Sequence, residues 1–168
     1  MLELKPISAA SIPKALIRAK HYRLLNEPWQ AESICRDILK LQGNHQQAIL
    51  YLILAITDQF SNEKKSSYVR EAKEYCTQLR SEYEQKYYRG IIEERLGKTH
   101  LTSNSPRANY IAYENYRNAM EFFQEAEAVH PEGNQDAILR WNACLRRINE
   151  FNLKSAPDDR QMQPFLDV

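Results

Sequence analysis

The residues of this 168-residue chain that are able to do chemistry are scattered rather than gathered into one motif. The histidines fall on four separate segments, at His21, His45, His100 and His130. The sequence has no Gly-rich phosphate loop, no His-Glu-x-x-His and no cysteine pair with zinc spacing. Glu93 and Glu94 are paired carboxylates, but neighbours on a helix point in different directions and cannot flank one substrate. We therefore expect no enzyme activity, no metal and no cofactor.

The cysteines are odd in number and spaced like residues on a helix face, at Cys35, Cys76 and Cys144. We expect reduced, buried thiols in a cytoplasmic protein rather than a disulfide framework. No apolar run approaches the ~18–20 residues of a membrane span. The first six residues include an acid and a proline, where a signal peptide would be continuously apolar. The sequence therefore predicts no membrane partner.

Charge argues against nucleic acid as a partner. Lysine and arginine number 23 against 22 acidic residues, so the formal net charge is only +1. Three tyrosines at a spacing of three have side chains that stack on bases, namely Tyr110, Tyr113 and Tyr116. No basic groove accompanies them in the sequence. We expect them to form an aromatic ladder that faces the core or a partner protein.

Helical periodicity and only four glycines predict an all-α chain of about seven helices. Gly43 is expected to be a left-handed helix cap, and Gly97 to end the fifth helix before a loop at Lys98–Ser105. The expected helices span 12–25, 29–41, 45–60, a stretch from Val69 to Leu79, a stretch ending at Leu96, 106–129 and 134–150. Residues 1–11 would form an N-terminal extension, 12–150 the helical domain and 151–168 a polar tail.

Small residues recur at fixed helical offsets in three parts of the chain. The clearest pattern is Gly90-x₆-Gly97 followed by Ala119-x₃-Phe123-x₂-Ala126-x₄-Pro131. An echo near the amino terminus reads Ala19-x₂-Tyr22-x₈-Ala31-x₃-Cys35-x₂-Ile38-x₄-Gly43. A weaker middle unit carries Ala48, Leu52, Ile53 and Ala72-x₃-Cys76-x₂-Leu79. Small side chains at a helix crossing let the two axes approach closely, since bulky ones would push them apart.

This pattern resembles the tetratricopeptide repeat, a helix–turn–helix unit of about 34 residues. The resemblance covers roughly residues 12–148. It implies a right-handed α-solenoid of antiparallel helix pairs, with three repeats and a final capping helix in which Trp141 and Ile148 cover the Phe123 side of the third unit. An unrelated helical bundle with chance alanine spacing is the alternative.

In that family the first helix of each repeat lines a concave surface. The resemblance places Leu16 and Lys20 there in the first unit, Leu50 and Leu54 in the second, and Tyr87 and Ile91 in the third, with Lys20, Arg23 and Arg95 at the rim. Because most of these residues are apolar, we expect a groove that binds an apolar helical or extended segment. A tightly coiled stack that covers these residues itself is the alternative. The charged positions with which one subclass grips chaperone tails are missing.

The resemblance implies a non-catalytic scaffold or adaptor whose partner is a protein or peptide segment. A chaperone that shields a secreted client in the same groove is the alternative, and a helical enzyme is a third class. A homodimer is a further expectation, through the tyrosine face or through the tail segment Met162-Gln-Pro-Phe165-Leu166. That segment is amphipathic and suited to an apolar groove, unless the tail remains undocked.

Overall fold

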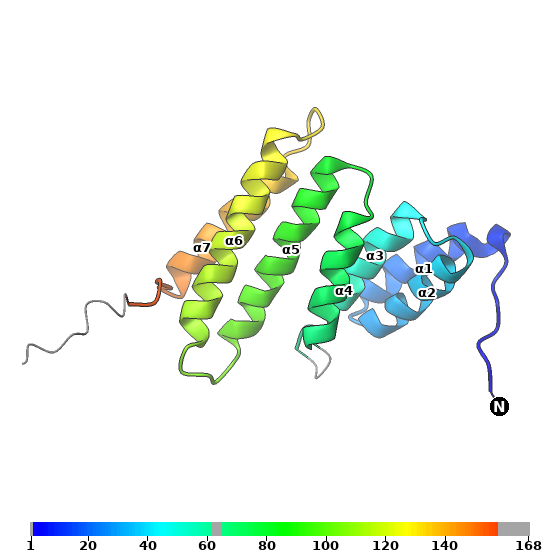
Figure 1. Cartoon of the computed structure of the whole chain (residues 1–168), viewed down its shortest axis with the longest axis horizontal. Coiled ribbons are helices and arrows are strands. Elements are labelled where there is room, and N and C mark those ends of the chain that lie inside the picture. The colour runs from blue at the N-terminus through cyan, green and yellow to red at the C-terminus, as the bar shows by residue number, and fades with distance from the viewer. Residues whose placement is uncertain (1, 62–64, 158–168) are drawn as a thin grey trace, which may run out of the picture.

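The computed structural model describes residues 2–61 and 65–157, which form seven α-helices and no strand (Figure 1). A short 3₁₀ turn at Ala9–Ser11 precedes the first helix. The helices are α1 (Ile12–Leu24), α2 (Pro28–Leu41), α3 (Gln46–Thr57), α4 (Lys65–Thr77), α5 (Glu82–Leu101), α6 (Ala108–Ala128) and α7 (Asp136–Glu150). The prediction of an all-helical chain is confirmed. None of these helices is both long and apolar enough to cross a membrane.

The helices lie in a row, with α1 and α2 at one end and α7 at the other (Figure 1). Each helix packs on the next one along the chain, and the most extensive contact joins α5 to α6. Helix α3 also contacts α1 on one side and α5 on the other. Contacts between alternate helices place the odd-numbered helices together along one face. This packing is consistent with a helical repeat.

The helix starts follow local capping chemistry. Pro13 and Pro28 lie in the first turns of α1 and α2, where a missing N–H costs no intrahelical bond. His45 precedes α3 and its Nδ1 accepts a hydrogen bond from the Ala48 amide at 3.3 Å. The Ser81 hydroxyl accepts in the same way from the Glu84 amide at 3.3 Å, at the start of α5. These side chains satisfy amide groups that have no partner within the helix.

Two expected helix ends differ from the prediction. Gly43 is not left-handed, and the residues with positive φ in the described part of the chain are Asn26, Asn152 and Gly133. Gly97 does not end the fifth helix, because α5 continues to Leu101 and the expected loop starts only after it. The reason is tertiary. A Cβ at residue 97 would lie 3.0 Å from the Tyr116 ring, so the glycine admits close contact with α6.

The buried side chains form two main clusters that meet at α5. The N-terminal cluster draws on α1 to α5 and includes Ile92 and Leu96. The C-terminal cluster draws on α5 to α7 and includes Ile91 and Phe123. Ile148 of α7 belongs to the second cluster, and the half-buried Trp141 packs against it. Helix α7 therefore covers the Phe123 side of the α5–α6 pair, as the sequence predicts.

Candidate functional site

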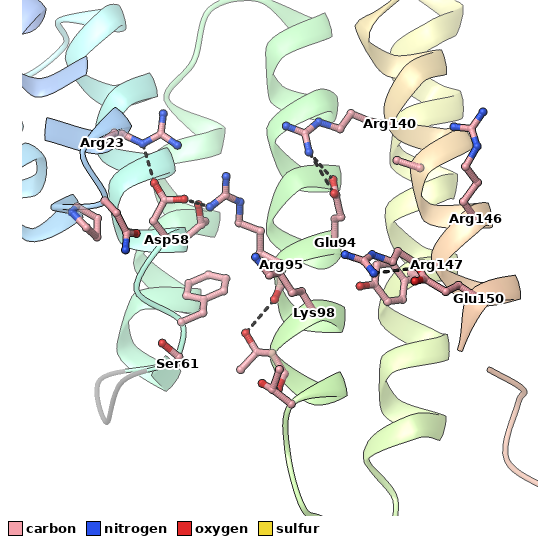
Figure 2. A pocket seen from close by; sticks show the side chains of 18 residues that line it. Arg23, Asp58, Ser61, Glu94, Arg95, Lys98, Arg140, Arg146, Arg147 and Glu150 are labelled. Carbon is pink, nitrogen blue, oxygen red and sulfur yellow. Dashed lines mark hydrogen bonds and ion pairs between the residues drawn. The ribbon is translucent and has the colours of Figure 1, made fainter. Parts of the chain in front are cut away.

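A cleft of about 840 Å³ lies along the odd-numbered helices (Figure 2). Its walls come from the α1–α2 turn, the end of α3, the second half of α5 and the inner side of α7. Phe60, Tyr116 and Ala143 supply apolar parts of the lining. Most of the remaining lining residues are charged or carry hydroxyl groups. Because the odd-numbered helices share one face of the row, segments that are far apart in sequence meet in this cleft.

One carboxylate at the α3 end of the cleft serves two guanidinium groups. Arg23 Nε donates to Asp58 Oδ2 at 2.7 Å, and Arg95 Nη1 pairs with the other oxygen, Oδ1 (Figure 2). Burial, together with the charges of Arg23 and Arg140, lowers the pKa of Arg95 to about 10. Arg95 therefore remains charged at neutral pH. Asp58 neutralises only one of its two partners.

The opposite wall carries two further ion pairs. Arg140 Nη1 lies 3.1 Å from Glu94 Oε1, and Arg147 Nη1 lies 2.9 Å from Glu150 Oε2. Burial raises the pKa of Glu94, although Arg140 opposes the shift. Burial also acts against the charge of Arg140, but Glu94 and Tyr87 together outweigh it and the pKa of Arg140 is raised. The Arg140 and Arg147 side chains are 40% and 49% exposed, so both are open to a ligand from the cleft.

The charges that line the cleft do not balance. Six lining side chains are cationic (Arg23, Arg95, Lys98, Arg140, Arg146 and Arg147) and three are acidic (Asp58, Glu94 and Glu150), which leaves an excess of three positive charges. The chain as a whole carries only +1. The excess has three sources: the shared Asp58, and the exposed Lys98 and Arg146, for which the described residues provide no ion pair. Positive charge is therefore concentrated in this cleft.

Two of the eight residues expected at a groove line the cleft, namely Arg23 and Arg95. The other six lie elsewhere. Leu16 and Leu50 are half-buried against the N-terminal packing, and Lys20 is exposed away from the cleft lining. Leu54 and Tyr87 pack against the C-terminal cluster, and Ile91 is only 1% exposed within it. The cleft lining is thus polar where an apolar groove was expected, because neighbouring helices already cover these apolar side chains.

Sequence reasoning missed most of the charged residues that do line the cleft. Their signal was present as helical spacing: Glu94 and Lys98 lie four residues apart on α5, and Thr102 follows four residues later at the end of that helix. On α7 the lining residues Arg140, Ala143, Arg147 and Glu150 follow the same three-and-four pattern. A search for charged stripes on alternate helices would have found this face.

Of the two surfaces expected to support a homodimer, the structure describes the tyrosine face but not the tail segment. Tyr116 is 2% exposed and packs against Gly97, and Tyr113 packs against the C-terminal cluster. Tyr110 is half-exposed. The tyrosine ladder therefore faces mainly into the fold, which is one of its two expected roles. The tail segment Met162–Leu166 lies outside the described residues.

The candidate nucleophiles and metal ligands are not assembled into a site within the described chain. Cys35, Cys76 and Cys144 are free and buried, and burial raises the pKa of each thiol to about 12. Their thiolate forms are therefore scarce at neutral pH. Among residues 2–61 and 65–157, no group of three His, Cys, Asp or Glu side chains is placed to hold a metal ion.

The fold and the cleft together define a row of packed helix pairs with a charged, solvent-open face. Comparisons of the chain with protein-family models, with curated proteins and with solved structures found no match.

Proposed function

We propose that this chain is a non-catalytic scaffold or adaptor that binds a segment of a partner protein in the cleft along α1, α3, α5 and α7. The observation that carries the proposal is the excess of cationic side chains in a cleft of about 840 Å³ that four helices build together. Unpaired charge destabilises a folded chain where it is partly buried, as at the Arg23–Asp58–Arg95 cluster, and a partner's carboxylate would relieve that cost. A surface that is left with free charge is suited to complement a partner.

The architecture that we propose is a right-handed solenoid of three tetratricopeptide-like repeats with α7 as the cap. The support is the close α5–α6 contact at Gly90 and the contacts of α3 with both α1 and α5. Repeat arrays of this kind expose extended surfaces on which partners bind. The buried free thiols agree with a reducing compartment, and we place the protein in the cytoplasm on that ground.

Two alternatives are less well supported by the cleft. A chaperone for an apolar client needs an apolar groove, whereas this lining carries six cationic and three acidic side chains. A hydrolytic enzyme needs a free carboxylate or histidine as a base. Each carboxylate of the cleft, at Asp58, Glu94 and Glu150, is paired with an arginine, and no histidine lines it.

Site-specific photo-crosslinking in the source cells tests the proposal. A benzoylphenylalanine at Thr102, which lines the cleft, is expected to crosslink to a partner protein. The matched control is the same residue at Glu121, which is exposed on α6 and does not line the cleft. Equal crosslinking from both positions, or crosslinking from Glu121 alone, would remove the cleft as the binding surface.

A further inference from the structure

We infer that the partner segment is acidic, and that its carboxylates are bound at three places: beside the Arg23–Asp58–Arg95 cluster, at Lys98 and at Arg146. This inference rests on the proposed function, and it adds the chemistry of the partner. The three places are the ones at which the cleft holds positive charge without a matching carboxylate in the described chain.

The first place is the cluster around Asp58. Two guanidinium groups share this single carboxylate, while each guanidinium carries five N–H donors. The side chains of Arg23, Arg95 and Asp58 are 21%, 24% and 20% exposed, so they are partly shielded and still reachable. A second carboxylate from a partner would complete the pairing, and charge pairs are stronger at such partly buried positions than on an open surface.

The other two places lie on two different walls of the cleft. Lys98 extends from α5 and Arg146 from α7, and both are exposed (Figure 2). The cleft also holds Arg140 and Arg147, whose pairs with Glu94 and Glu150 are open enough to exchange with a ligand carboxylate. A segment that lies in the cleft therefore meets cations from both α5 and α7.

The charge pattern favours a protein segment over a nucleic acid. The excess is three charges, and three carboxylates stand among the cations. Duplex DNA carries about one negative charge per 1.7 Å of its axis, so it would meet those carboxylates with repulsion. A protein segment with a few spaced acids avoids them. The guanidinium fork also matches the planar carboxylate in shape.

Fluorescence anisotropy with the full chain tests the inference. The probe is a labelled peptide of about four Gly-Ser-Glu repeats, and its control replaces each Glu with Gln. At low salt, where the screening length exceeds about 10 Å, the Glu peptide is expected to bind and the Gln peptide to bind at least tenfold more weakly. The double variant Lys98→Glu/Arg146→Glu is expected to weaken Glu-peptide binding by about tenfold or more, since attraction becomes repulsion at two contacts.

The matched control is Arg107→Glu/Arg117→Glu, which makes the same change in net charge at exposed residues outside the cleft lining. Its effect on peptide binding is expected to stay within about twofold, because the Debye length limits distant charges. The milder pair Lys98→Gln/Arg146→Gln is expected to give an intermediate loss. Circular dichroism of every variant checks the fold.

Several outcomes would overturn the inference. They are equal binding of the Glu and Gln peptides, equal loss in the cleft and control variants, and tighter binding of a single-stranded oligonucleotide of the same charge. If Asp158→Asn/Asp159→Asn in the full chain raised peptide affinity tenfold or more, the acidic occupant would be the chain's own tail. If Thr102 crosslinks to a partner protein but the chain does not prefer the Glu peptide, this inference fails and the proposed function stands. If Thr102 gives no crosslink to a partner, the proposed function fails.

Discussion

A single methyl group at Gly90 tests the packing of α5 on α6. Gly90 faces the ring of Phe123, which is completely buried. A Cβ built at residue 90 would lie 2.5 Å from Cε1, 2.7 Å from Cδ1 and 2.9 Å from Cζ of that ring. Carbon atoms in good contact are separated by roughly 3.5–4.0 Å. The alanine variant therefore forces the ring or the helix to move.

Two effects oppose each other in Gly90→Ala. Alanine improves helix propensity by about 0.8–1.0 kcal/mol over glycine. Overpacking of a filled core costs about 1–3 kcal/mol, and overlap with three ring atoms at a fully buried site belongs at the upper end. The free energy of unfolding is expected to fall by about 1–2 kcal/mol, because overlap exceeds propensity. The melting temperature should fall by about 2–8 °C in a chain of this size.

Urea unfolding followed by circular dichroism measures the effect, with two glycines as matched controls. Gly97→Ala meets the Tyr116 ring at 3.0–3.2 Å and should be milder. Gly43→Ala has no neighbour nearer than 3.7 Å and should gain about 0.4–1 kcal/mol through the unfolded state. Adding Phe123→Leu should reduce the cost of Gly90→Ala. If Gly90→Ala unfolds at the same urea concentration as the parent, the inferred close contact is refuted.

Three further predictions concern buried groups. The cysteine thiols should react with DTNB slowly in the folded chain and rapidly in urea, because burial raises each pKa to about 12; fast reaction without urea would contradict this. Burial raises the Glu94 pKa, so the folded chain binds more protons than the unfolded chain above pH 4.5, and its stability falls as pH rises there. Glu94→Gln should flatten that slope in urea titrations, and an unchanged slope would refute the assignment. Lys73→Met removes the ammonium group 2.9 Å from the buried Glu93, which keeps the Asn115 amide as a hydrogen-bond donor, and should cost about 1–3 kcal/mol in urea unfolding; adding Glu93→Met should restore part of it, and no loss in the single variant would count against the pair.

The helix pattern was readable because it depends on neighbours in sequence. Pro13 marks the start of α1 through backbone chemistry within one turn, whereas the starts of α2 at Pro28 and of α5 after Ser81 were not predicted. Helix ends were harder to predict, since a glycine can either cap a helix in the left-handed conformation or allow another helix to pack closely against it. Gly97 has the second role, and only the position of Tyr116 reveals it.

The cleft was predicted only in part. The resemblance to the tetratricopeptide repeat led us to expect Arg23 and Arg95 at the rim of an apolar groove, and both line the charged cleft. Sequence analysis did not find their shared partner Asp58, because it follows the end of α3 and its pairing depends on how α1, α3 and α5 meet. The resemblance placed Ile91 in the groove, yet the α5–α6 contact buries it, as the alternative of a self-covering stack expects for this residue.

The amino-acid order by itself determined that this chain is helical, that its helices number about seven, and that small residues mark close crossings. These properties follow from periodicity and from side-chain volume, which act locally. Only the tertiary structure decided which side of each helix meets its neighbour, and therefore which side chains stay in water. Packing between neighbouring helices buries the apolar residues. The charged residues of α5 and α7 line the cleft, because burying unpaired charge costs more free energy than leaving it in water.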